Sequence, residues 1–497
     1  LTAGVTYDWM EDRPGNSYAV LNPLYPSAAN ITNGNLSSGT TAARATMNST
    51  AIDSQWFVTA GASAVTAGVI DDSGSTNTTT VTANKVFGFK MTAAGALSYK
   101  NVTDAGSWTS IATGLTGNRW PYSVTQAASW NFGQQPLPEA LDTGFLALCQ
   151  QNLPEGAVRN PKKHFDAKTR TGTAATYSVT GIEFQPDFVW VKSRGRAVDH
   201  ALYDSVRGVE KRLETNNTDA EVTGDTTGLT AFNSDGYTGG ALDQINGTTA
   251  TNSFIDWLWK ANGAAVSNTN GTITSQVSAN VEAGFSIVTY TGTLSSAGTA
   301  TVGHGLGKAP SLIISKSRNN VGDSGQLVAR HKDLASVNHY LRLNTTDTPV
   351  NSSGNGPMSA PTSTVFSTNW TSGMNANGGT FVAYCFTDVP GYQKIGSYTG
   401  NGSTDGVYVD LGFKPAFVMV KCSSTTGNWT IFDEDRPGYN VIGGQLWPNL
   451  ATAEATTATI DFTSRGFKAR LTTDPNSAQT FIYYAAAAVN GKYSNSL

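Results

Sequence analysis

A short segment occurs three times in this chain and carries most of the information about its fold. The copies read GIEFQPDFVWVKSR from Gly181, HGLGKAPSLIISKSR from His304 and LGFKPAFVMVKCS from Leu411. They align on a proline, and a lysine follows six positions later in each copy; the prolines are Pro186, Pro310 and Pro415, and the lysines are Lys192, Lys316 and Lys421. Consecutive apolar residues between them are typical of a strand that is covered on both faces. Proline can begin such a strand because the first position can forgo a ladder hydrogen bond.

Flanking features keep the same order around each proline. A Leu precedes an Asn by three positions downstream, at Leu213 and Asn216, Leu341 and Asn344, and Leu446 and Asn449. Each copy then closes with an aromatic strand that begins at Phe254, Phe381 or Phe481. We therefore predict three repeats, over residues 160–262, 284–388 and 391–490, each a β-sandwich of about a hundred residues. The fold class is all-β, a tandem array of jelly-roll or lectin-like sandwiches.

Two segments lie outside the repeats. Residues 263–283 are small, polar and rich in Gly, Asn and Ser, and we expect a linker or an extended interdomain strand there. Residues 1–155 lack the repeated segment and form a separate module. Its run from Val86 to Val102 alternates apolar positions around a turn at 93–95, which predicts a β-hairpin.

Composition limits the function classes. Only 14% of the 497 residues are charged, the net charge is −4, and no local basic cluster is present, so we do not expect nucleic-acid binding. The longest apolar runs are far shorter than the roughly 20 residues that cross a bilayer, so we expect no membrane insertion. The first residues, LTAGVTYDWM, have neither an initiator Met nor the charged start of a signal peptide, and they indicate no localisation.

No cofactor or metal site is expected. The five histidines form no zinc-binding spacing, and no D-x-D-x-D-G calcium loop occurs. The cysteines Cys149, Cys385 and Cys422 lie in apolar, strand-like runs, and we interpret them as buried structural thiols.

The N-terminal module resembles the SPRY-type, concanavalin-like sandwich of many phage structural proteins. The resemblance rests on YAVLNPL at Tyr18, the hairpin ending in SYKN, the Trp120-Pro121 pair, NFGQ at Asn131 and GFLALCQQNLPE at Gly144. It implies a β-sandwich over residues 1–155.

The repeats resemble a domain of unknown function that recurs in structural proteins of tailed bacteriophages, especially marine ones. The motifs are PDFVWVKSR at Pro186, ALYDSVRG at Ala201, FNSDGY at Phe232 and IDWLWK at Ile255. The second repeat departs most, with VARHKD in place of YDSVRG. The resemblance implies a virion location on the particle surface, other virion proteins as partners and a homo-oligomer, a trimer in fibres of this type. It implies no catalytic residue.

Candidate binding residues come from the aromatic side chains next to turns. Trp108, Trp120, Trp370 and Trp429 could stack on sugar rings, although core packing is the alternative for each. Such a surface would bind host polysaccharide almost independently of salt, because neutral groups dominate it. The D-x-x-R pairs at Asp204 and Asp433 and the repeated lysines are interpreted as structural.

No nucleophile-base pair or matched carboxylate pair is evident, and we do not expect an enzyme. The leading hypothesis is a virion structural protein, a fibre-like appendage or a head or tail decoration protein that attaches to host glycans. A virion polysaccharide depolymerase and a free secreted lectin are the alternatives.

Overall fold

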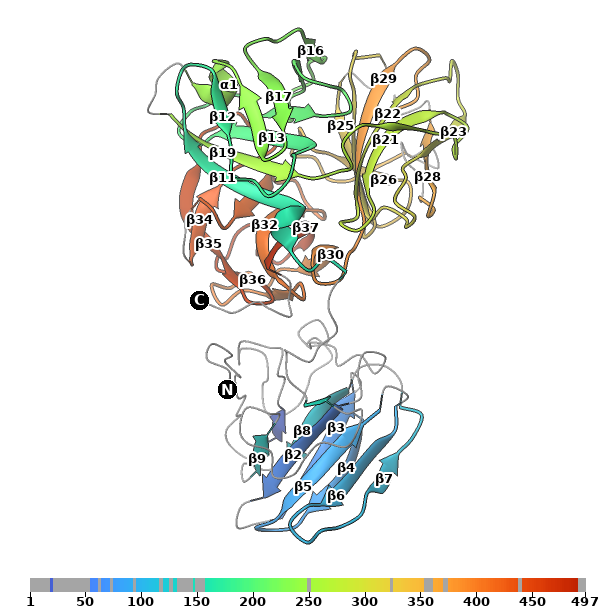
Figure 1. Cartoon of the computed structure of the whole chain (residues 1–497), viewed down its shortest axis with the longest axis vertical. Coiled ribbons are helices and arrows are strands. Elements are labelled where there is room, and N and C mark those ends of the chain that lie inside the picture. Colours follow the sequence, from blue (N-terminus) through green and yellow to red (C-terminus); the bar gives the residue numbers. More distant parts are fainter. Residues whose placement is uncertain are drawn as a thin grey trace. The chain divides into compact units, whose positions relative to one another are not determined.

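The structure is a computed structural model that divides into two compact units, residues 1–156 and 157–490, apart from two short segments. It describes residues 18–20, 54–60, 64–71, 75–92, 95–115, 119–124, 128–131, 146–147, 157–247, 252–321, 325–352, 361–369, 374–436 and 440–489. Strands dominate both units, as the sequence predicts (Figure 1). Among the described residues, no helix is long and apolar enough to span a membrane.

The first unit contains two sheets, in which all described strand pairs are antiparallel except the parallel pair of β10 and β2. One has the order β1 (Tyr18–Val20), β8 (Arg119–Val124), β3 (Val65–Asp71), β4 (Thr76–Val81). The other has the order β10 (Leu146–Ala147), β2 (Ser54–Ala60), β5 (Val86–Met91), β6 (Leu97–Asn101), β7 (Thr109–Ala112), and β9 (Ala128–Asn131) also pairs with β2. Phe87, Phe89 and Val69 lie in their shared core. The predicted hairpin is β5 and β6, and Gly95 in its turn has φ of 79°, a conformation that favours glycine.

The second unit contains the three repeats, and their main sheets have the same strand order. These sheets are β11 (Phe165–Thr171), β19 (Ser253–Trp259), β13 (Phe188–Ser193), β14 (Ala201–Asp204); β22 (Phe285–Thr291), β29 (Thr380–Phe386), β24 (Leu312–Ser317), β25 (Leu327–His331); and β30 (Gln393–Thr399), β37 (Thr480–Val489), β32 (Lys414–Cys422), β33 (Trp429–Asp433). The repeated proline segment and the closing aromatic strand are neighbours in every copy, so the predicted repeat is confirmed.

A smaller sheet covers one face of each main sheet. These sheets are β12 (Tyr177–Val179), β18 (Gly236–Gly239), β17 (Leu229–Asn233); β23 (Thr299–Gly303), β28 (Val365–Asn369); and β31 (Tyr408–Asp410), β36 (Gly466–Ala469), β35 (Ala455–Thr463), β34 (Ile442–Gln445). Further elements are the 3-10 helix η3 (Pro161–Lys163), β15 (Lys211–Arg212), β16 (Val222–Thr223) and α1 (Asp243–Asn246), and β26 (His339–Arg342) and β27 (Val350–Asn351) extend the main sheet of the second repeat beyond β25.

Each main sheet is buried on both faces. One face packs on the smaller sheet of the same repeat, and the other packs on the neighbouring repeats. In β13, Val189 and Val191 face the core inside the first repeat, whereas Phe188 and Trp190 face a core that all three repeats share. The run of consecutive apolar residues in the sequence therefore reflects neighbouring repeats as much as the repeat's own sandwich. This arrangement explains why the three repeats form one compact unit rather than separate bodies.

Aromatic rings close the shared core between every pair of repeats. Phe188 stacks on Tyr384 with ring centroids 4.3 Å apart, Phe386 packs on Tyr484 at 4.8 Å, and Trp259 packs on Phe417 at 5.5 Å. A cavity of about 20 Å³ remains among these rings. It is close to the space that one water needs, and its apolar lining offers a water no partner.

The segment 263–283 forms two strands, β20 (Val266–Asn268) and β21 (Ser275–Asn280), at the edge of the second repeat's main sheet. Residues 273, 275 and 277 are buried, while 272, 274 and 276 are exposed. This alternation with a period of two is a strand signal that the polar composition of the segment conceals. The segment is therefore part of a sheet, and of the two forms expected for it the strand is the one observed.

Candidate functional site

Of the four tryptophans that were predicted to bind ligand, the structure describes the side chains of Trp108 and Trp429. Trp108 is half-buried, and the ammonium groups of Lys90 and Lys100 lie 4.2 and 4.8 Å from its ring centroid. Trp120 lies in β8 opposite Ile70, but its side chain is outside the described residues, as is the whole of Trp370. Described contacts therefore bring none of the four together.

Trp429 has a structural role instead. Its side chain is 2% exposed, and its indole Nε1 donates a hydrogen bond to the carbonyl of Arg342 in the second repeat at 2.9 Å. A ring enclosed between two repeats offers no face to a sugar. We therefore withdraw it from the candidate binding residues, since burial at a junction between repeats accounts for it.

The repeated lysines link the repeats in a closed cycle. Lys192 of the first repeat donates to the carbonyl of Ala451 in the third at 3.0 Å. Lys316 of the second donates to the carbonyl of Asn217 in the first at 3.0 Å, and Lys421 of the third donates to the carbonyl of Thr346 in the second at 3.3 Å. The receiving loop in each case follows the repeated Leu and Asn. The sequence indicated that the lysine is structural, but it did not indicate that the lysine donates a hydrogen bond to a neighbouring repeat.

Burial changes the acid-base behaviour of these lysines. Each is at most 1% exposed. Loss of hydration lowers the pKa of Lys192 and of Lys316 to about 8, although nearby carboxylates oppose this, and it also lowers the pKa of Lys421. Carbonyl oxygens replace the lost water as acceptors. The amino groups are therefore structural hydrogen-bond donors rather than exposed charges for a ligand.

A series of ion-paired side chains provides a second kind of contact at two of the three junctions between repeats. Between the first and second repeats, Arg318 binds Glu221, which also accepts from Arg207 at 2.9 Å. Arg207 pairs with Asp204, whose carboxylate accepts from the hydroxyl of Tyr384 at 2.8 Å.

The junction between the third and first repeats has the same chain. Arg194 binds Glu454 at 2.9 Å, and Glu454 also accepts from Arg436 at 3.1 Å. Arg436 pairs with Asp433 at 2.7 Å, and Asp433 accepts from the indole of Trp257 at 2.9 Å. The interpretation of the D-x-x-R pairs as structural salt bridges is confirmed, since both are buried within these junctions.

Among the described residues, the junction between the second and third repeats has no such chain of charged side chains. His331 occupies the position that is aspartate in the other two repeats. The strand register shows this equivalence: His331 is opposite Leu312, as Asp204 is opposite Phe188. Its Nε2 lies 3.2 Å from the carbonyl of Tyr483, and its Nδ1 accepts from the backbone of Asp333 at 3.1 Å. With both ring nitrogens engaged, the neutral imidazole fits, and burial lowers the pKa of His331 to about 4.

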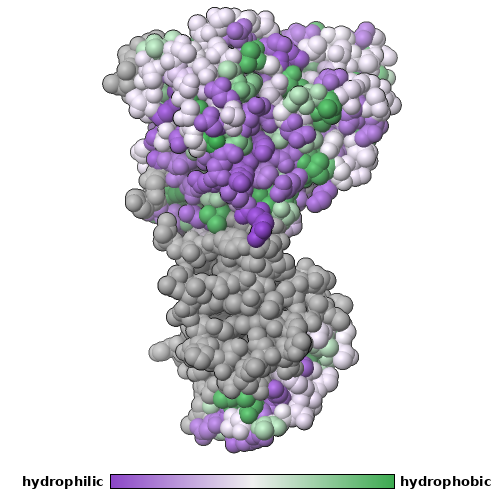
Figure 2. Space-filling view, in the orientation of Figure 1, coloured by the Kyte–Doolittle hydropathy of each residue, from purple (hydrophilic) through white to green (hydrophobic). Residues whose placement is uncertain are grey.

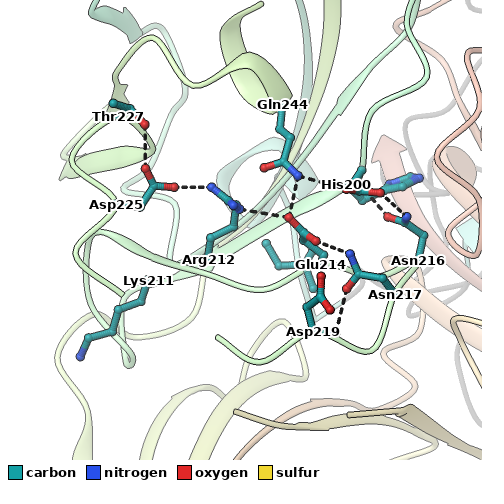
Figure 3. A network of polar contacts seen from close by, with 12 residues as sticks. His200, Lys211, Arg212, Glu214, Asn216, Asn217, Asp219, Asp225, Thr227 and Gln244 are labelled. Atoms are coloured by element: carbon teal, nitrogen blue, oxygen red, sulfur yellow. Dashed lines mark hydrogen bonds and ion pairs between the residues drawn. The ribbon is translucent and has the colours of Figure 1, made fainter. Parts of the chain in front are cut away.

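A polar network stiffens the loop of the first repeat that receives Lys316 (Figure 3). Glu214 lies at its centre and accepts hydrogen bonds from Gln244 at 2.6 Å, from Arg212 at 3.3 Å and from Asn217. Arg212 also pairs with Asp225. These carboxylates are occupied by protein donors, and among the described residues no group of three or more His, Cys, Asp or Glu could hold a metal ion.

One carboxyl group is perturbed in a way that active sites often show. Burial, followed by repulsion from Asp433 and Glu434, raises the pKa of Asp435 to about 7. Glu434 lies 3.4 Å from the ammonium of Lys414. A carboxyl that is half-protonated near neutral pH can act as a general acid, although ion-pair networks perturb pKa values too.

An open groove of about 430 Å³ lies on the second repeat, at the end of the main sheet beside β20 and β21. It is lined by Thr272, Ile273, Thr274, Gln276, Thr289, Tyr290, Thr291, Thr293, Arg318 and Thr380. One wall of the groove is the segment around Ile273. Its position is fixed because the Ile273 side chain is buried and the Ile273 amide donates a hydrogen bond to the carbonyl of Thr301 at 2.9 Å. Sequence reasoning missed this groove, since its wall is the segment expected as a linker or extended strand.

The architecture defines a class of all-β protein in which three sandwich repeats interlock around a common core. Residues 160–489, all three repeats and more than half of the chain, match the model of a domain of unknown function, DUF7483. The chain therefore belongs to that family. No curated protein and no solved structure matches it.

Removing one partner of a junction salt bridge should destabilise the protein strongly. Asp204→Ala or Asp433→Ala removes one of the two carboxylates that hold a buried arginine, and we expect a loss of about 3–5 kcal/mol in the free energy of unfolding. Asp405→Ala is the matched control, because its pair with Lys468 is exposed on the acid side and should be worth at most about 1 kcal/mol. Chemical denaturation measures all three. Equal losses in junction and control variants would contradict the assignment.

The buried lysines at the junctions should make the free energy of unfolding depend on pH in the alkaline range. The pKa of Lys316 is about 8 in the folded protein and 10.5 ordinarily, so the unfolded state binds more protons between these values. The free energy of unfolding from this residue should rise with pH in that window, by up to about 1.4 kcal/mol per pH unit. Subtracting the values for Lys316→Met removes the opposite effect of buried tyrosines. Parallel pH profiles for the two proteins would show that Lys316 is not perturbed.

Proposed function

We propose that this chain is a structural protein of a bacteriophage particle, a fibre-like appendage or a head or tail decoration protein, that contributes to attachment to host-surface glycans. The observation that carries the structural role is the closed cycle of lysine contacts among the three repeats. Each repeat both donates to one neighbour and accepts from the other. Such closure favours a rigid module with no internal hinge, which suits a permanent component of a particle.

Surface chemistry supports the attachment role. With 14% charged residues, the chain relies on Ser, Thr, Asn and Gly for solubility. The visible surface over residues 157–490 in Figure 2 combines pale areas, the colour of residues near the middle of the hydropathy scale, with a broad purple, hydrophilic area. Hydroxyl and amide groups can exchange water for sugar hydroxyls without the desolvation of a charge. This chemistry suits weak contacts that many copies on one particle would multiply.

The particle context rests on the sequence resemblances, to phage-type repeats and to the SPRY-type module at residues 1–155. Under this proposal the partners are other virion proteins and further copies of this chain, with a trimer as the expected form. The location is the outer surface of the particle.

The alternative is a virion depolymerase that cleaves host polysaccharide, and Asp435 is the observation that favours it. Its pKa of about 7 is suitable for a general acid. We favour the structural role because the neighbouring Asp433 is committed to Arg436 and Trp257 and is 0% exposed. A free secreted lectin is a further alternative that shares the binding role.

Locating the protein tests the virion role. Antibodies to the chain should label purified particles in electron micrographs, and the chain should co-purify with them through a density gradient at a constant ratio to the major head protein. Its presence only in the medium would exclude the virion role and favour the secreted lectin.

An assay of polysaccharide cleavage separates the structural role from the enzymatic one. Incubation of the full chain with purified host polysaccharide should release no new reducing ends. Release that Asp435→Asn abolishes, while its unfolding midpoint is unchanged, would establish the depolymerase instead.

A further inference from the structure

We propose that the groove on the second repeat binds a short, uncharged oligosaccharide. The inference rests on the proposed role in glycan attachment and gives it a site and a ligand class. Its volume of about 430 Å³ lies within the range of roughly 300–1,000 Å³ that is usual for small-molecule sites. A saccharide of a few rings would fill it.

The lining supplies many hydrogen-bonding groups that the protein does not use itself. Thr274, Gln276 and Thr291 are exposed, and within the described part of the chain no protein partner holds their side chains. Each hydroxyl can donate and accept, and the amide of Gln276 can do both with fixed geometry. Sugar hydroxyls need both kinds of partner, so this set matches a polyol more closely than it matches an apolar ligand.

The charge balance of the groove favours an uncharged ligand. Among the described residues that line it, the one cation is Arg318, which binds Glu221 through two hydrogen bonds, at 3.0 and 2.6 Å. Glu221 is in turn held by Arg207 at 2.9 Å. A ligand carboxylate would have to compete with this pair, and doing so would weaken the junction between the first and second repeats. An uncharged sugar binds without that cost.

In the second repeat, the segment with β20 and β21 forms one wall of the groove. The strands equivalent to β22 carry hydroxyls at the same register: Thr171 pairs with Ser253 and Thr399 with Thr480, as Thr291 pairs with Thr380. Within the part of the chain that the structure describes, β11 and β30 are the edge strands of their sheets in the first and third repeats, and no strands equivalent to β20 and β21 pair with them. These positions have the same chemistry on an open surface, and they provide matched controls.

The experiment compares groove variants with an equivalent site outside the groove. The probes are trisaccharides of glucose, mannose, galactose and N-acetylglucosamine, with trigalacturonate as the charged counterpart, and binding to the full chain is followed by saturation-transfer NMR and calorimetry at low and high salt. We expect millimolar or tighter binding of at least one neutral probe, unchanged by salt. Gln276→Ala should weaken it about three- to tenfold, as expected for one or two lost hydrogen bonds.

Thr291→Trp should fill the groove and abolish binding, whereas Thr171→Trp should leave it unchanged. Unaltered unfolding midpoints would show that the variants fold. The proposal is overturned if no neutral probe binds, if trigalacturonate binds better than every neutral probe, or if Gln276→Ala and Thr291→Trp bind as well as the native chain. The location of the chain in particles is measured separately, so a groove that binds sugar in a protein absent from particles would refute only the virion role.

Discussion

The rest of the second unit depends on one constraint: each repeat buries a lysine against a loop of a neighbouring repeat. A lysine loses most of its hydration when it is buried, and it is tolerated only where carbonyl groups replace the water. In this protein each lysine has at least one such carbonyl in a loop of a different repeat, as with Lys316 and Asn217, while Lys192 and Lys421 also donate to carbonyls of their own repeat. The repeats must therefore meet in one register, and the aromatic core forms between sheets whose positions are already fixed by polar contacts.

The three junctions are related but not identical. Two of them contain an arginine-glutamate-arginine-aspartate chain, whereas the third has His331 and a carbonyl partner. Charged chains are costly to desolvate, but once buried they tolerate no misplacement, since an unpaired ion would remain. The third junction relies more on neutral groups and packing, including Trp429. Sequence divergence in the second repeat thus has a direct structural counterpart.

The proposed binding surface and the shared core use different parts of the same repeat. The centre of each main sheet is fully committed to the two cores and offers nothing to a ligand. The outer end of β22 emerges from the core, and there the hydroxyl side chains of Thr289 and Thr291 alternate with the buried ring of Tyr290. An added pair of strands converts this end into a groove in the second repeat. The buried interior of the second repeat is thereby combined with an open edge whose lining consists mainly of hydroxyl side chains.

The sequence by itself determined the all-β class, the three repeats, the strands after Pro186, Pro310 and Pro415, and the structural nature of the D-x-x-R pairs. These follow from local patterns, because alternation, proline position and repeated spacing are properties of neighbouring residues. Only the tertiary structure decided that Lys192, Lys316 and Lys421 cross between repeats, that Trp429 is enclosed, and that residues 272–276 form a groove wall. The physical reason is that burial and hydrogen-bond partners come from segments distant in the chain. A strand's pattern shows that a face is covered, but not which repeat covers it.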